Sequence, residues 1–335
     1  MQNLVLNYIR TKLQESHKLL QMLGISHAAF LSVIFGMMLL SFPLGVFVVF
    51  HSNVGDNINF EYPVISSNLF GNNDLFFEIS LGDVFIVFWT MYAIFFTIAI
   101  FGPRKGFLQI LSVIITDGKI TPHQNYLVLI TKWFSILILV SAIITYTQEF
   151  FGIQTLPPVV GNDLMQFFYI SLSPLTEEIG FRSLLIGIPI FLMYSHRFSI
   201  IHFFKSIWNP MSNIHVYSSK RSIALVVITG VIFGFAHIAL GEPWSEGKFL
   251  QASASGIILG WLYIHAGLLA AIMVHWGTNY FIFAYANFIS QTNEIALDAS
   301  FYHPLLNTME IVFLISGILS IAMLIFHKIG SKNNL

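Results

Sequence analysis

Three ionisable residues, Glu177, Glu178 and Arg182, lie within six consecutive positions of an otherwise apolar stretch. An ionisable side chain at the middle of a membrane costs at least about 2.5–3.5 kcal/mol on insertion scales, so such residues usually face a protein interior or a cavity. Glu178 and Arg182 are four residues apart on one helix face and can form an ion pair. Glu177 lies about 100° around the helix and has no share in that pair. We therefore interpret Glu177 as a candidate general base and the pair as its support.

Two other apolar stretches carry polar side chains that need partners inside the protein. His237 lies in the first of them, and His275 and Asn279 lie four residues apart in the second. Either histidine alone is accounted for by an ordinary hydrogen bond between buried helices. Together with Glu177 these groups predict one shared interior, because polar helix faces in lipid must be satisfied by other helices. We expect all four side chains to line one polar cavity.

This set of side chains suits hydrolysis. The carboxylate and one imidazole can activate a water molecule, while the other imidazole and the carboxamide can donate hydrogen bonds to a tetrahedral oxyanion. One zinc ion held by Glu177, His237 and His275 is also chemically sensible, because catalytic zinc commonly takes His and carboxylate ligands plus water. The sequence leaves both mechanisms open. It contains no H-E-x-x-H helix, no Gly-x-Ser-x-Gly elbow and no cysteine nucleophile.

The composition predicts which elements position these residues. Hydrophobic residues make up 56% of the 335 positions and charged residues only 9%, against about 25% charged residues in a soluble domain. We expect an all-α, polytopic transmembrane bundle in the cell membrane, with the lipid bilayer as a partner and no nucleic acid. About eight spans of adequate length are predicted. They lie near 28–50, 83–101, 126–147, 164–194, 222–240, 250–266, 268–289 and 307–327.

The positions of the basic residues predict the orientation of the bundle. Lys and Arg cluster before span one, between spans two and three, between spans four and five, and after span eight. The connections 51–82, 148–163 and 290–306 contain neither residue, and 241–249 holds only Lys248. The positive-inside rule therefore predicts cytoplasmic N- and C-termini.

Four regions follow along the chain. Residues 1–26 are predicted as a cytoplasmic or interfacial helix lying on the membrane, although a mobile polar tail fits about equally well. Residues 27–163 hold three spans and the outer loop 51–82. Residues 164–290 hold the candidate site, and 291–335 hold the last span and a cytoplasmic tail.

Straight helices would not place the candidate residues at one depth. His275 would lie nearer the cytoplasm than His237 by about 10 Å, at 1.5 Å per residue. Either the predicted span boundaries are displaced by about one turn, or a helix is tilted or broken. Places where a break can occur are Pro174 and Pro189 in the fourth span and Gly230 and Gly234 in the fifth.

Three blocks of this sequence resemble the type II CAAX prenyl endopeptidases and the wider CPBP group, also called Abi proteins. The family patterns are E-E-x-x-x-R, F-x-x-x-H and H-x-x-x-N. The blocks here are Glu177-Glu178-Ile-Gly-Phe-Arg182, Phe233-Gly-Phe-Ala-His237 and His275-Trp-Gly-Thr-Asn279. Residues 256–263 are similar as well, and the similar region covers roughly 164–290. One departure is Ser183, where members of the family often have glycine.

The resemblance implies an intramembrane endopeptidase that cuts a membrane-associated or lipidated peptide, with CAAX-type processing of prenylated proteins as one form. It implies that Glu177 is the water-activating base, assisted by His237. His275 and Asn279 would form the oxyanion hole, and the neighbouring ion pair would position the site. The family has been treated both as glutamate-dependent and as a metalloprotease, so a zinc cofactor stays open.

Two other functions compete with a peptidase. A catalytically silent relative could act as a membrane immunity or scaffold protein, and it would be expected to lose a residue of the three blocks. A proton-coupled transporter could use intramembrane Glu and His as ion carriers. It would more naturally show inverted repeats, and the sequence contains no repeat that we detect.

Overall fold

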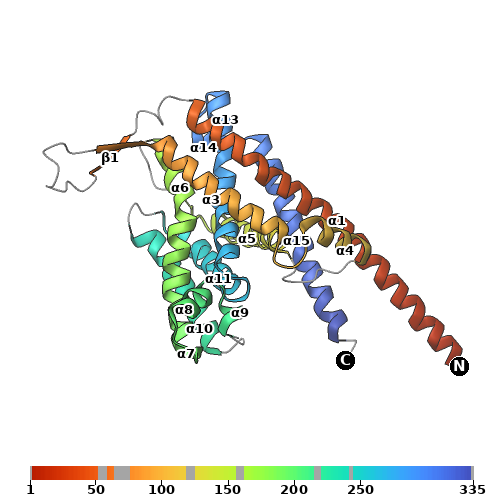
Figure 1. Cartoon of the computed structure of the whole chain (residues 1–335). Helices are drawn as coiled ribbons and strands as arrows, with labels where there is room; N and C mark the ends of the chain where they lie inside the picture. The colour runs from red at the N-terminus through yellow and green to blue at the C-terminus, as the bar shows by residue number, and fades with distance from the viewer. Residues whose placement is uncertain are drawn as a thin grey trace.

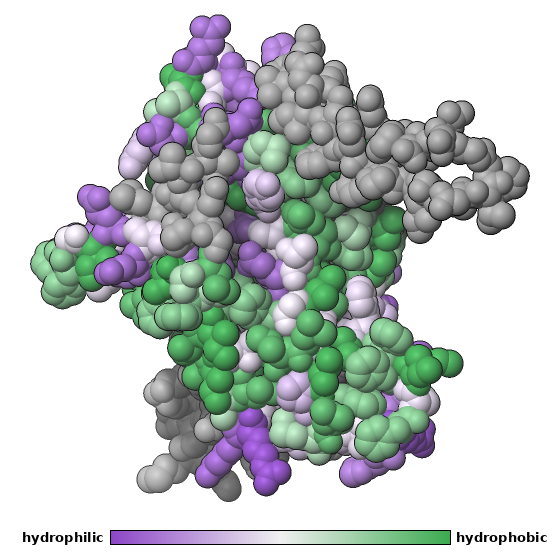
Figure 2. All heavy atoms as spheres, turned by 90° about the vertical axis from the view of Figure 1, so that its left-hand side faces the viewer, coloured by the Kyte–Doolittle hydropathy of each residue, from purple (hydrophilic) through white to green (hydrophobic). Residues whose placement is uncertain are grey.

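The chain folds into a bundle of long helices in our computed structural model, which confirms the predicted all-α, polytopic class (Figure 1). The structure describes residues 2–51, 59–63, 76–117, 125–155, 162–214, 220–240 and 244–332. Figure 2 shows a broad apolar belt across one face of the bundle, with hydrophilic residues gathered toward its upper and lower ends. Such a belt is what a protein presents to the hydrocarbon core of a bilayer.

Among the described residues, seven helical segments are long and apolar enough to cross a membrane. Six of them coincide with a predicted span to within a few residues, and the first begins ten residues earlier than predicted, at Lys18. They are α1 (Gln2–His51, apolar from Lys18), α3 (Leu81–Phe101), α5 (Tyr126–Phe150), α10 (Lys220–Ala239), α11 (Lys248–Ala266), the continuous run α12 (Leu268–Trp276), η2 (Gly277–Phe281) and α13 (Ile282–Asn293), and α15 (Pro304–Lys332).

The remaining predicted span, 164–194, is helical throughout but is divided into three segments. These are α6 (Asp163–Glu177), the π-helix η1 (Glu178–Gly187) and α7 (Ile188–Tyr194). Pro189 lies in the first turn of α7, where its missing N–H group costs least. The number of eight spans stays a prediction, as does the cytoplasmic side of both termini.

Short elements connect these helices. A two-stranded antiparallel ribbon, β1 (Asn59–Pro63) with β2 (Phe76–Ser80), lies in the predicted outer loop and leads directly into α3. The rest of that loop falls outside the described residues. Four short helices complete the chain: α4 (Phe107–Asp117), α8 (Ile200–Trp208), α9 (Pro210–Ile214) and α14 (Leu297–Ser300).

The predicted N-terminal segment, residues 1–26, is not separated from the first span. From residue 2 onward it belongs to α1, one continuous helix that extends beyond the rest of the bundle (Figure 1). The helical part of the prediction thus agrees with the structure, and its placement on the membrane surface stays a prediction.

Aromatic side chains hold α1, α3 and α6 against the segment that carries His275. Trp89 of α3 donates a hydrogen bond to the hydroxyl of Tyr280 at 2.8 Å, and Tyr280 donates to the backbone carbonyl of Ser41 in α1 at 3.1 Å. Tyr92 donates to the carbonyl of Ser171 in α6 at 2.8 Å. Because the ring bodies are buried and their polar ends are satisfied, they fix α6 and η2 relative to one another.

Two glycines allow α10 and α11 to approach at backbone distance. A Cβ atom added to Gly230 would lie 2.8 Å from the backbone nitrogen of Ile257, and one added to Gly256 would lie 2.9 Å from Cα of Gly230. Small residues at a helix crossing in membranes permit this close packing. The same helix, α11, then reverses into α12 at Gly267, whose φ of 88° suits glycine.

Replacing Gly230 with Ala should destabilise the protein by about 1–3 kcal/mol, because the added methyl group meets backbone atoms that cannot rotate away. The midpoint of thermal unfolding in detergent would measure the change. Gly36→Ala is the matched control, since an added Cβ there meets nothing within 4 Å. Equal behaviour of the two variants would contradict the close α10–α11 contact.

Candidate active site

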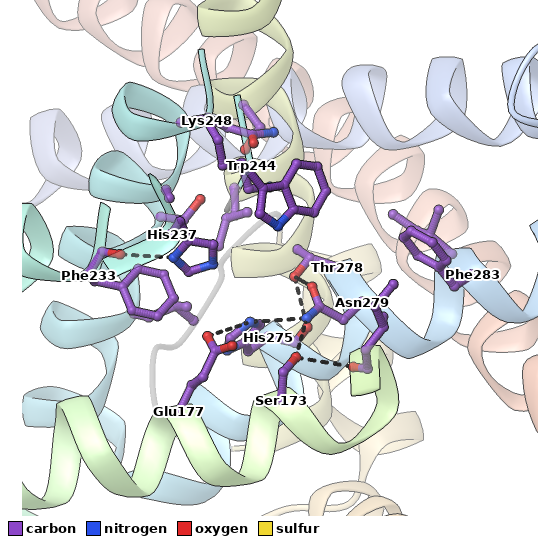
Figure 3. A pocket seen from close by; sticks show the side chains of 18 of the residues that line it. Ser173, Glu177, Phe233, His237, Trp244, Lys248, His275, Thr278, Asn279 and Phe283 are labelled. Carbon is purple, nitrogen blue, oxygen red and sulfur yellow. Dashed lines mark hydrogen bonds and ion pairs between the residues drawn. The ribbon is translucent and has the colours of Figure 1, made fainter. Parts of the chain in front are cut away.

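The four side chains predicted to share an interior do line one cavity, with a volume of about 670 Å³ (Figure 3). Glu177 enters from the end of α6, His237 from α10, and His275 and Asn279 from α12 and η2. The four side chains thus reach one cavity, although straight helices would have placed His275 and His237 at different depths in the membrane. The π-helical segment η1 begins immediately after Glu177, and η2 begins two residues after His275. A π-helical turn changes the direction in which the following side chains point, and both changes occur next to residues of the site.

The predicted Glu178–Arg182 ion pair is present and fully buried. Arg182 Nε lies 3.0 Å from Glu178 Oε2, and the two side chains are 1% and 0% exposed. The guanidinium also lies over the ring of Phe233, with 4.5 Å between Cζ and the ring centroid. Burial of both charges is tolerable because each is paired within the protein.

Glu178 has a second partner that the sequence did not indicate. Its Oε1 lies 2.8 Å from Nδ1 of His275. The ionised carboxylate can only accept, so His275 donates through Nδ1–H, which leaves Nε2 directed at the cavity. His237 is held in the same manner, because its Nδ1 lies 2.9 Å from the carbonyl oxygen of Phe233, which also only accepts.

Glu177 is the carboxylate that stays available. Its Oε2 lies 3.8 Å from Nε2 of His275, and its side chain is 27% exposed toward the cavity. No described residue donates a hydrogen bond to this oxygen. The site therefore gathers the Glu177 carboxylate and two imidazole rings around a common space, which is an arrangement that can hold and deprotonate a water molecule.

Asn279 is positioned by a serine that the sequence analysis missed. Its Nδ2 donates to Oγ of Ser173 at 2.7 Å and lies 3.3 Å from Nε2 of His275. Ser173 in turn donates to the carbonyl of Ile170 at 3.2 Å. That carbonyl has no α-helical donor because Pro174 stands four residues later. The signal in the sequence was this Ser-Pro pair within a span, since a proline frees a carbonyl that a nearby hydroxyl can satisfy.

Three cavity residues near the end of α10 and the start of α11 were also missed as site candidates. Trp244, Lys248 and Gln251 line the cavity, and Figure 3 shows Trp244 and Lys248 on the side away from Glu177 and Ser173. The sequence carried one signal for them, because Lys248 is the single cation of a connection on the side that otherwise lacks Lys and Arg.

The predicted zinc ligands do not form a preassembled metal site. Within the described part of the chain, no three His, Asp or Glu side chains are placed to hold one ion. The positions of Glu177, His237 and His275 therefore do not support the zinc hypothesis.

One comparison with known proteins agrees with this geometry. Residues 161–281 match the family model described as type II CAAX prenyl endopeptidase Rce1-like. The match confirms the predicted resemblance over that segment, and it supports a function of the CAAX-type intramembrane protease kind. No curated protein and no solved structure matches the chain.

Glu178→Gln should lower the free energy of unfolding by about 3–5 kcal/mol, because it leaves Arg182 buried without its counter-charge. The double variant Glu178→Gln/Arg182→Met should lose less than the sum of the two single variants, since it removes both charges together. Chemical denaturation in detergent measures all three.

Glu149→Gln provides the control for that cycle. Glu149 is an exposed carboxylate of α5, and its replacement should change stability by no more than about 0.5 kcal/mol. Strict additivity of the two buried substitutions would show that Glu178 and Arg182 do not depend on one another.

Proposed function

We propose, from this family match and the geometry of the cavity, that the protein is an intramembrane endopeptidase of the cell membrane. It hydrolyses a peptide bond at or within the bilayer with a water molecule activated by Glu177. The observation that carries the proposal is the Glu177 carboxylate, which lines the same cavity as His237 and His275 and receives no hydrogen bond at Oε2 from any described residue.

In the proposed first step, water is held between Glu177 and His237. The carboxylate accepts one proton of the water, and the Nε2 lone pair of His237 accepts a hydrogen bond from the other. The water oxygen then forms a bond to the carbonyl carbon of the substrate, and the carbonyl oxygen becomes an oxyanion. The Asn279 carboxamide, held by Ser173, is placed to donate to that oxyanion.

His275 acts as the proton carrier in the second step. Its Nε2 lies 3.8 Å from Oε2 of Glu177 and can receive the proton that Glu177 has taken. Glu178 orients the ring and stabilises the resulting imidazolium through Nδ1–H, as a carboxylate does for a catalytic histidine in general. The proton then passes to the leaving nitrogen as the C–N bond breaks. In its protonated form His275 can also donate to the oxyanion, the role that the family resemblance implies.

The lining of the cavity supports a membrane-associated or lipidated substrate. Apart from its polar end, the cavity is bordered by apolar side chains of α5, α6, α11 and α13, among them Ile138, Ile170, Leu259 and Phe283. A volume of about 670 Å³ is in the range of ligand pockets, roughly 300–1,000 Å³. A prenylated C-terminal segment is the specific form of substrate that we propose.

The two alternatives have less support. A silent immunity or scaffold protein needs no water-activating group, whereas all seven defined residues of the three blocks are present, and five of them form the hydrogen-bonded or charged contacts described above. A proton-coupled transporter needs a path on both sides of the site, and no contact described here favours one.

Cleavage of a quenched fluorescent prenylated peptide by the purified protein tests the proposal. Glu177→Gln should lower kcat by at least about 100-fold, because general base catalysis contributes roughly 10²–10⁴. His237→Ala and His275→Ala should also lower kcat strongly. His265→Ala, which changes an exposed histidine outside the cavity, is the control. Cleavage by Glu177→Gln at the rate of the unaltered protein would refute the assignment.

A chelator tests the metal question in the same assay. Since the residues do not form a preassembled zinc site, incubation with 1,10-phenanthroline should leave kcat within about twofold. Loss of activity that returns on addition of zinc would restore the metalloprotease mechanism.

A further inference from the structure

Lys248 is a cavity residue that the proposed reaction does not use. It is the one Lys or Arg among the described residues that line the cavity. Its Nζ lies 4.1 Å from the centroid of the Trp244 ring, and no described carboxylate lies close enough to form an ion pair with it. A desolvated ammonium group that has only an aromatic ring as a close neighbour is placed to receive an anion.

Gln251 lies one helical turn from Lys248 on the same face of α11 and also lines the cavity. Its Oε1 is buried and has no hydrogen-bond partner among the described residues. An unpaired buried acceptor costs about 1–3 kcal/mol, so a donor from a bound molecule would relieve it. Lys248 and Gln251 thus present one cationic donor and one neutral acceptor side by side.

We propose that Lys248 and Gln251 form a subsite for the C-terminal residue of the peptide substrate. The ammonium group of Lys248 binds the free α-carboxylate, and Oε1 of Gln251 accepts the N–H of the same residue. This inference rests on the proposed peptidase function and specifies its substrate: a peptide that ends inside the cavity.

The position of the subsite agrees with a short product. Figure 3 shows Lys248 and Trp244 across the cavity from Glu177 and Ser173, so the carboxylate end and the bond to be cut occupy opposite sides. An extended peptide advances about 3.3 Å per residue, so a few residues separate the two. A peptide that continues beyond this point places no carboxylate beside Lys248 and leaves that charge unpaired, so it would bind poorly.

Peptide binding tests this subsite independently of turnover. The background is Glu177→Gln in phosphatidylcholine nanodiscs, and the ligands are one fluorescent prenylated peptide as its free acid and as its C-terminal amide. The free acid should bind about 10- to 100-fold more tightly, as expected for a charged hydrogen bond. Adding Lys248→Met should abolish that preference and leave the affinity for the amide unchanged.

Lys205→Met is the matched control, because it removes the same charge from an exposed position on α8. It should keep the preference for the free acid. Gln251→Leu should weaken both ligands to a similar extent, since both carry the N–H group.

Four outcomes would overturn the proposal. Equal weakening of acid and amide by Lys248→Met would assign Lys248 to Glu177 or to folding instead. A preference that disappears when phosphatidylglycerol is added would assign the subsite to a lipid headgroup. Equal cleavage of acid and amide by the protein with Glu177 intact would remove the subsite while the peptidase function stands. Absence of both binding and cleavage would refute the proposed function, and the subsite with it.

Discussion

The contact on which the site depends is the buried chain Arg182–Glu178–His275. It joins η1 to α12 through an ion pair of 3.0 Å and a hydrogen bond of 2.8 Å, with all three side chains removed from water. In a medium of low dielectric such contacts are strong when complete and costly when broken. A helix rotation that separated Glu178 from His275 would leave Oε1 of Glu178 buried without its hydrogen-bond donor. The orientation of the His275 ring, the position of Glu177 and the spacing of the two helices are therefore fixed by one requirement.

Much of this site could be predicted from the sequence because intramembrane charge is informative. In a chain with 9% charged residues, the pairing of Glu178 with Arg182 follows from their spacing alone, and the gathering of Glu177, His237, His275 and Asn279 follows from the cost of leaving them in lipid. Seven of the eight spans agree with apolar helices of the structure, since length and hydropathy are local properties.

What could not be predicted depends on the phase of helices relative to one another. The contact of Glu178 with His275 depends on how η1 and α12 cross. Residue spacing within one helix gives no information about such a crossing. The π-helical segments shift the phase after Glu177 and near Asn279, whereas a prediction with 3.6 residues per turn assumes it constant. Ser173 and Lys248 were missed for a related reason. A serine next to a proline and a lysine at a helix end are common in connections. Only the structure shows that both side chains line the same cavity.

The approach of α10 to α11 at Gly230 and Gly256 has a consequence for how material enters and leaves. Backbone atoms of the two helices touch there, so no hydrocarbon chain can slide between them from the surrounding lipid. His237 and Phe233 of α10 therefore lie next to a helix crossing that lipid chains cannot pass. Other parts of the cavity lining are formed by α5, α6 and α13, away from this crossing. Two hydrogen atoms in place of side chains thus make one helix pair impermeable to lipid.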